Sequence, residues 1–262
     1  AHAEMVLGVL LWQSGDAATG VVHLRESARQ YKSADDPDKT IIALHNLASA
    51  QYEIGEIRRA KRAFWREILL RRRRYTPRIA NSLYNAALVA WRQCDYRTAV
   101  SLLNETIELA SELDDARVRI AAHQLLALVC ADTGEIVRAR EHLSSAEAQL
   151  TGYDDAYHRA HYLLSAARVA LTAGEIECAR ARAVEAESLA AFSGIDHVEA
   201  EACAFLGEVA FVAGDVDLAS KRIRAGIDQL VRLGVNGIVP RLQALAAASE
   251  LSAGVSHGGL DD

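Results

Sequence analysis

The sequence predicts an all-α fold, a right-handed superhelical solenoid of six antiparallel helix pairs plus a C-terminal capping helix. Three observations predict it. A short motif returns six times in 262 residues, at intervals of 40, 39, 40, 40 and 40 residues. Apolar residues on both sides of each motif follow the i, i+3, i+4, i+7 spacing of helices. The composition, 51% hydrophobic and 24% charged with three prolines, suits a buried core and rules out a disordered or collagen-like chain.

Each copy of the motif has an anchor where one helix ends and the next begins. The anchors are Gly15, Gly55, Cys94, Gly134, Gly174 and Gly214. A glycine supplies the positive φ of a helix C-cap, and an Asp or Glu follows at the next helix N-terminus. A small residue seven positions before the anchor and another five positions after it let the two helices approach closely. A large apolar residue nine positions after most anchors fills the space between pairs.

The motif divides the chain into units of two helices, each helix about 14–17 residues long. The units cover about 1–35, 36–75, 76–114, 115–154, 155–195 and 196–235. Asp36, Asp115, Asp155 and Asp196 are placed to cap the next first helix, and Pro37 sits in its first turn. A thirteenth helix over 238–253 covers the apolar face of the sixth unit, and 254–262 form a flexible tail. We expect one continuous solenoid over 1–253.

This pattern resembles the tetratricopeptide repeat (TPR). The resemblance rests on Leu7-Gly8, Leu47-Ala48, Leu126-Ala127 and Leu206-Gly207, followed by the glycine anchor, an alanine and a large apolar residue. The period is about 40 residues rather than 34, and the consensus terminal proline is absent. Such long periods are similar to the repeats of kinesin light chain and of bacterial TPR-containing regulators.

The resemblance implies that the first helices line a concave groove. Carried over position by position, it implies the following groove residues: His45, Asn46, Tyr52, Asn81, Tyr84, Asn85, Trp91, Arg92, Gln124 and Arg168. Asn46 and Asn85 fall on the same repeat position, and an amide both donates and accepts, as an extended peptide backbone requires. They are equally interpreted as repeat consensus.

Other groove residues have two interpretations. The aromatic residues Tyr52, Tyr84 and Trp91 suit either ligand contact or packing between repeats. Arg92 and Arg168 suit either a carboxylate of a ligand or a groove acid such as Glu53, Asp132 or Glu208.

Residues 58–78 contain ten Lys/Arg and one acid, Glu67, for a net charge of +9, while the rest of the chain carries −15. They form the second helix of the second unit, with Phe64, Ile68 and Leu69 turned inward. The predicted convex basic patch consists of Arg58, Arg59, Arg62, Arg66, Arg71, Arg72, Arg73 and Arg74. A solvated face, an acidic partner and nonspecific contact with nucleic-acid phosphates remain open interpretations.

The sequence favours a non-catalytic protein. It has no Ser-His-Asp set, phosphate loop or HExxH motif, and we expect no enzyme activity and no cofactor. His158 and His161 share a helix face but have no third ligand nearby, so we expect no metal. The acid pairs Asp114/Asp115 and Asp154/Asp155 are interpreted as helix caps rather than glycosidase carboxylates.

No apolar run reaches the ~18 residues that a membrane span needs, and no signal peptide is visible. Cys94, Cys130, Cys178 and Cys203 contain no CxxC spacing and suit small buried positions on helices. We therefore expect a cytoplasmic protein.

The sequence predicts a non-catalytic arm of a larger bacterial regulatory protein that binds a peptide or protein segment in its groove. One alternative is a scaffold that docks a partner, or nucleic-acid phosphates, through 58–78. Another is a small-molecule sensor of a transcriptional regulator. Self-association is open, nucleic acid is disfavoured without being excluded, and no membrane partner is expected.

Overall fold

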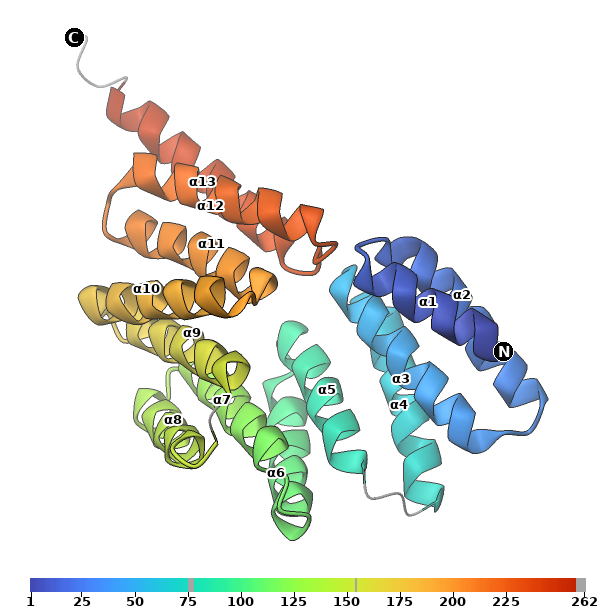
Figure 1. Cartoon of the computed structure of the whole chain (residues 1–262). Coiled ribbons are helices and arrows are strands. Elements are labelled where there is room, and N and C mark those ends of the chain that lie inside the picture. Colours follow the sequence, from blue (N-terminus) through green and yellow to red (C-terminus); the bar gives the residue numbers. More distant parts are fainter. Residues whose placement is uncertain (75–77, 154, 258–262) are drawn as a thin grey trace. The chain divides into compact units, whose positions relative to one another are not determined.

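The structure is a computed structural model that describes residues 1–74, 78–153 and 155–257, with side chains described up to residue 251. These residues form thirteen α-helices and no strand (Figure 1). The helices are α1 (His2–Gln13), α2 (Ala17–Ser33), α3 (Pro37–Glu53), α4 (Ile57–Arg74), α5 (Ile79–Arg92), α6 (Tyr96–Glu112), α7 (Ala116–Asp132), α8 (Ile136–Leu150), α9 (Ala156–Thr172), α10 (Ile176–Ser193), α11 (Asp196–Val212), α12 (Val216–Arg232) and α13 (Val239–His257).

The anchors end the first helices as predicted. Every anchor has a positive φ, from 79° to 93° at the five glycines and 58° at Cys94. A second series of left-handed residues ends the second helices. Among the described residues it includes Asp35, Asp114, Gly194 and Gly234. Both turns of the first, third, fifth and sixth units thus use the conformation that a glycine adopts without strain, whereas α8 ends at Thr151 in a right-handed conformation.

Aspartate caps follow the prediction in three of four cases. Asp36 accepts a hydrogen bond from the Lys39 amide, Asp115 from the Val118 amide and Asp155 from the His158 amide. Asp196 is different, because α11 begins one residue earlier than predicted and Ile195 is its N-cap. The predicted cap at Asp196 is therefore wrong, and this carboxylate lies in the first turn, where it still interacts favourably with the helix dipole. Asp154, the other member of its predicted acid pair, lies outside the described residues.

The chain divides into two compact units, Ala1–Val129 and Cys130–Asp262. In the first unit, consecutive helices from α1 to α6 pack in order, and the first helix α3 also contacts both α1 and α5. In the second unit, helices α8 to α13 pack in order, and α11 also contacts both α9 and α13. The predicted all-α fold of antiparallel helix pairs is confirmed within each unit. A single solenoid over 1–253 stays a prediction.

Close approach within pairs depends on small residues, as the repeat predicts. In α1 and α2, a Cβ added to Gly20 would lie 2.7 Å from the Gly8 carbonyl oxygen. In α11 and α12, a Cβ added to Gly207 would lie 2.6 Å from Ile223 Cγ1 and 2.9 Å from the Ala219 carbonyl oxygen. These backbones touch where no larger side chain fits.

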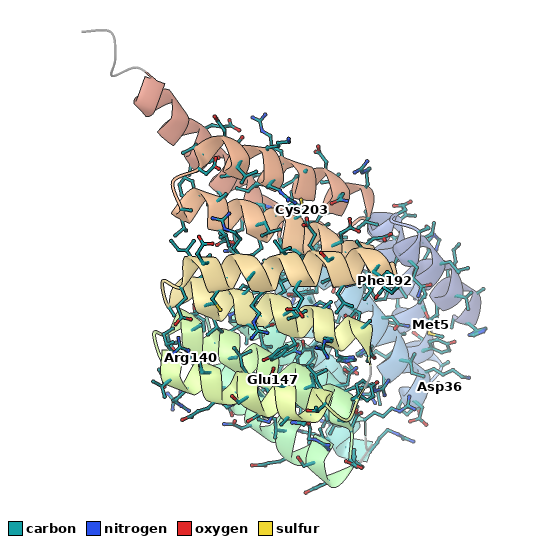
Figure 2. The ribbon with its side chains drawn as sticks, turned by 60° about the vertical axis from the view of Figure 1, so that its left-hand side comes forward. Met5, Asp36, Arg140, Glu147, Phe192 and Cys203 are labelled. Carbon is teal, nitrogen blue, oxygen red and sulfur yellow. The ribbon has the colours of Figure 1, made fainter. Side chains whose placement is uncertain are left out.

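Three predictions about individual segments are wrong. The thirteenth helix continues to His257, so 254–257 are helical, because the alanine-rich run before them propagates the helix; residues 258–262 lie outside the described residues. Leu69 is exposed on the outer face of α4, whereas Phe64 and Ile68 are buried. Cys94 and Cys178 are exposed, whereas Cys130 and Cys203 are buried. Figure 2 shows Cys203 on α11.

Candidate functional site

The first helices of the first unit present a shared polar and aromatic face. The Trp12 indole N–H of α1 donates a hydrogen bond to a Glu53 carboxylate oxygen of α3 at 2.5 Å. The Arg92 guanidinium of α5 lies 5.6 Å from the centre of the Tyr52 ring of α3. These contacts link neighbouring first helices side chain to side chain, so the face is held by its own residues.

Two asparagines on this face have no hydrogen-bond partner among the described residues. Asn46 of α3 and Asn85 of α5 occupy the same repeat position and are half-buried. No other side chain or backbone group in the described part of the chain bonds to either amide, and the same is true of the exposed Asn81. A half-buried amide that the protein leaves unbonded is available to a ligand.

The other predicted groove residues of the first unit are engaged by the protein itself. Tyr52, Tyr84 and Trp91 are half-buried and pack against the core between the helix pairs. Gln124 of α7 is buried. The His45 ring turns towards α4, where its Nδ1 lies 3.2 Å from both Glu67 carboxylate oxygens. His45 thus serves the helix interface.

Arg168, the one predicted site residue of the second unit, is also engaged. Its guanidinium lies 4.8 Å from the centre of the Phe205 ring, and its Nη1 lies 3.9 Å from a Glu208 carboxylate oxygen. Arg241 of α13 donates to the other Glu208 oxygen at 2.5 Å. Of the two interpretations for Arg168, the structure shows pairing with a groove acid.

Glu67 is the feature that sequence reasoning missed. It is completely buried in α4, and its carboxylate accepts hydrogen bonds from Ser82 Oγ at 2.6 Å and from Arg71 Nε at 2.8 Å. Burial opposes its ionisation, but the hydrogen bonds from His45, Ser82 and Arg71 outweigh it and hold the pKa of Glu67 below its ordinary value. The network joins α3, α4 and α5.

The predicted basic patch separates into paired and unpaired arginines. Arg71 is mostly buried against Glu67, Arg72 donates to Glu105 of α6 at 2.8 Å, and Arg74 lies 2.8 Å from Asp38 of α3. Arg59 pairs with Glu56. The remaining arginines, which lack a carboxylate partner within the described residues, are Arg58, Arg62, Arg66 and Arg73.

The unpaired arginines surround an apolar pair. Trp65 and Leu69, one helical turn apart on α4, are both exposed. We call Arg58, Arg62, Trp65, Arg66, Leu69 and Arg73 the α4 outer stripe. The part of the predicted stretch at 75–77 lies outside the described residues.

Histidines of the second unit lie in an aromatic cluster with Tyr157. The His161 ring centre lies 4.5 Å from that of Tyr157 and 5.8 Å from that of His197. Burial, together with the nearby His197 and His158, lowers the pKa of His161 to about 3. Over the described ranges, no group of three His, Cys, Asp or Glu side chains is arranged to hold a metal ion.

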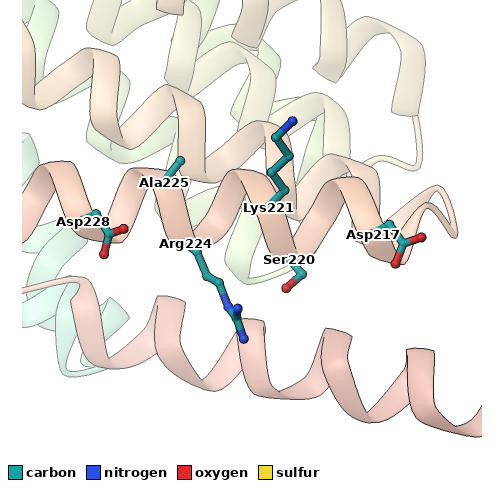
Figure 3. A pocket seen from close by; sticks show the side chains of 6 residues that line it. All are labelled: Asp217, Ser220, Lys221, Arg224, Ala225 and Asp228. Atoms are coloured by element: carbon teal, nitrogen blue, oxygen red, sulfur yellow. The ribbon is translucent and has the colours of Figure 1, made fainter.

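A shallow depression lies on the outer side of α12 (Figure 3). All the residues that line it belong to this one helix, namely Asp217, Ser220, Lys221, Arg224, Ala225 and Asp228. Arg224 points towards α13, where it pairs with Glu250. A single convex helix does not enclose a ligand, so the depression does not form a ligand site.

Among the described residues, none of the helices combines the length and the apolar composition that a membrane span requires.

The fold is that of known TPR proteins. NprR in complex with its cognate peptide NprX superposes with a TM-score of 0.73 at 17% sequence identity, covering 93% of this chain and 71% of that chain. A putative kinesin light chain of TPR-like repeats from Podosopora anserina gives 0.58 at 18% identity, covering 74% of this chain and 95% of that chain. The TPR-type fold predicted from the sequence is thereby confirmed.

A third similar structure belongs to an enzyme. Aspartyl phosphate phosphatase F from Bacillus subtilis gives a TM-score of 0.69 at 14% identity, covering 89% of this chain and 60% of that chain. No family model matches the sequence, and no curated protein matches it. At these identities the likeness concerns the fold, so the prediction that the chain has no enzyme activity stays a prediction.

Proposed function

We propose that the chain is a non-catalytic peptide- or protein-binding TPR domain, the interaction or sensor arm of a larger bacterial regulatory protein. Its ligand is an extended peptide or partner segment, bound along the face of α3 and α5. NprR, which has the same fold, was crystallised with its cognate peptide, and this supports a peptide as the class of ligand.

The observation that carries the proposal is the pair of unbonded amides at one repeat position. Asn46 and Asn85 project from neighbouring first helices, and each has a donor and an acceptor to offer. A backbone in extended conformation presents the complementary pair of groups at each residue. Two such amides therefore hydrogen-bond to the backbone of a peptide, and neighbouring side chains select its sequence.

The surrounding contacts hold the face ready for binding. Trp12 is hydrogen-bonded to Glu53, and Arg92 lies over the Tyr52 ring, so little side-chain entropy is lost when a ligand binds. The same contacts supply aromatic surface and mixed charge beside the amides. In our proposal, the Arg92 guanidinium is the cation on this face that pairs with a carboxylate of the ligand.

The test is peptide selection followed by amide removal. Peptides selected from a displayed random library on the whole chain are measured by calorimetry against the wild type and the Asn46→Ala/Asn85→Ala variant. We expect affinity to fall at least tenfold, because each lost hydrogen bond in a partly buried site costs about 1 kcal/mol.

Asn104→Ala provides the matched control, because Asn104 is exposed on the second helix α6. It should bind like the wild type. Unchanged affinity in the double variant with an intact circular dichroism spectrum would refute the proposal. Stabilisation by small metabolites but by no peptide would instead support the sensor alternative.

The α4 outer stripe favours a second candidate, a scaffold that docks an acidic partner. Four arginines that lack carboxylate partners in the described chain flank Trp65 and Leu69, a combination enriched at protein interfaces. We expect Arg62→Glu/Arg66→Glu to abolish capture of an acidic protein partner and to leave peptide binding unchanged. Loss of both activities, or of neither, in co-purification and calorimetry would count against a separate docking face.

A further inference from the structure

The second unit has an acidic counterpart of the α4 outer stripe. The residues of that stripe stand three, seven, ten, eleven, fourteen and eighteen positions after the anchor Gly55. The same positions after the anchor Gly174 lie on α10, and all six are exposed. We call these residues the α10 outer stripe: Glu177, Ala181, Val184, Glu185, Ser188 and Phe192. Two helices of one chain therefore present equivalent faces to solvent, one with four arginines and one with two glutamates.

Both stripes expose large apolar side chains beside their charges. On α10, Phe192 is 92% exposed and Val184 is 45% exposed. Figure 2 labels Phe192. On α4, Trp65 and Leu69 are exposed as described above. Exposed aromatic side chains next to arginine or to a charged rim are typical of protein interfaces.

The glutamates of the α10 outer stripe are accessible to another molecule. Glu185 is exposed and has no cationic partner among the described residues. Glu177 lies 3.5 Å from Arg180, but its side chain is 84% exposed, and an exposed pair of this kind contributes little stability. Opposite charges on the two stripes thus remain available for a contact between molecules.

The other second helices, all described at these six positions, do not offer the same complement. In α2, α6 and α12 the positions include basic residues, for example Arg25, Arg97 and Lys221. In α8 they include one acid, Glu141, and one large apolar residue, Val137. Only α10 combines two acids and two large apolar residues with no base.

We propose that the α4 outer stripe of one molecule docks the α10 outer stripe of a second copy of this chain. This inference rests on the second candidate function, since it names the acidic partner of the α4 outer stripe. Charge complementarity argues for a second copy, because every copy carries the acids and the apolar side chains that the basic stripe lacks. They stand at the same repeat positions of a helix of the same kind, so the two faces match in length and spacing.

A parallel alignment of the two helices matches the stripes position by position. The third, seventh, tenth and fourteenth positions are separated by steps of four, three and four residues, the spacing at which parallel helices place equal positions opposite each other. In this alignment the opposing residues are Arg58 and Glu177, Trp65 and Val184, Arg66 and Glu185, and Arg73 and Phe192. They form two ion pairs, one apolar contact and one cation–π contact. The apolar and aromatic contacts supply most of the affinity, whereas the charges select the partner face.

The experiment follows self-association of the whole chain by analytical ultracentrifugation over a concentration series. The wild type should form complexes whose fraction rises with protein concentration and falls with added salt. Arg58→Glu/Arg66→Glu and Glu177→Arg/Glu185→Arg should each associate at least tenfold more weakly. An equimolar mixture of these two variants should associate again, because it brings an unchanged α4 outer stripe together with an unchanged α10 outer stripe.

Glu108→Arg/Glu141→Arg is the matched control, because it reverses two exposed acids on α6 and α8 and changes the net charge as much as Glu177→Arg/Glu185→Arg does. It should associate like the wild type. A wild type that stays monomeric at every concentration, or a mixture of the two variants that fails to associate, would overturn the proposal. If the chain is monomeric and Arg62→Glu/Arg66→Glu still abolishes capture of an acidic protein, this inference is wrong and the second candidate function stands.

Discussion

At the scale of single residues, Glu67 departs from the repeat. It stands twelve positions after its anchor, where the other units have Ser27, Thr106, Ala146, Ala186 and Gly226, all small and all buried. A carboxylate at such a position is buried with them, and it is stable there only because His45, Arg71 and Ser82 satisfy it. The sequence signal for this buried carboxylate is an acidic residue at a repeat position where the other five units have a small residue.

Removing the charge of Glu67 should destabilise the first unit. In Glu67→Gln, the mostly buried Arg71 loses its ionic partner, and we expect a loss of about 3–5 kcal/mol in the free energy of unfolding, measured in urea. Glu135→Gln, which breaks the exposed pair with Arg138, should cost less than about 1 kcal/mol. Similar losses of unfolding free energy in both variants would show that the buried Glu67 network stabilises the protein no more than an exposed ion pair does.

His161 should make the protein sensitive to acid. Its pKa is about 3 in the folded state and about 6.5 when unfolded, so between these values the unfolded chain binds a proton that the folded chain does not. Stability therefore falls as pH falls below 6.5. From pH 7.5 to pH 5 we expect this group to remove about 2 kcal/mol of unfolding free energy, a loss absent in His161→Gln.

The pH range in which stability is lost distinguishes His161 from Glu67. The lowered pKa of Glu67 means that its contribution is present above the ordinary glutamate pKa and is lost only in more acidic solution. His2→Gln, at an exposed position of α1, should retain the wild-type pH dependence. If His161→Gln and the wild type lose the same unfolding free energy between pH 7.5 and pH 5, the assignment to His161 is wrong.

At the scale of elements, contacts between helices decide what a charged segment does. The run Arg71–Arg74 predicts a continuous exposed patch on α4. In the structure, Arg71 turns to Glu67, Arg72 to Glu105 of α6 and Arg74 to Asp38 of α3. Periodicity places these side chains around α4 but does not say which acids the neighbouring helices bring near.

The α11–α12 pair tests the close approach that the repeat predicts. Gly207→Ala places a Cβ against Ile223 and the Ala219 carbonyl, so the helices must separate or the side chain must shift. We expect a loss of about 1–3 kcal/mol in thermal or urea unfolding.

Gly152→Ala is the control for this substitution, because nothing lies within 4 Å of a Cβ added there. It should leave stability within about 0.5 kcal/mol of the wild type. If both alanine variants are equally stable, the α11–α12 contact tolerates a methyl group and the repeat does not require a small residue at this position.

At the scale of the whole molecule, charge is unevenly divided. Residues 1–129 contain 18 Lys/Arg and 15 Asp/Glu, a net of +3, whereas residues 130–262 contain 11 and 20, a net of −9. The sum is the chain's −6. An acidic partner is therefore favoured at the first unit alone, which agrees with the position of the α4 outer stripe.

The helix pairs, their turns and most of their caps follow from the amino-acid sequence alone. These features depend on local residues, since a positive φ, a capping aspartate and a helical apolar spacing each act within a few positions of the chain. The sequence also places Asn46 and Asn85 at equivalent positions of neighbouring helices, because a fixed period carries positions from one unit to the next.

Which side chains remain available depends on the tertiary structure. It engages His45 with Glu67 and Arg168 with Glu208, leaves the amides of Asn46 and Asn85 unbonded, and exposes Phe192 on α10. Partner choice between side chains depends on distances across helices whose contacting residues are 22 to 40 positions apart in these two pairs, and no local pattern encodes those distances.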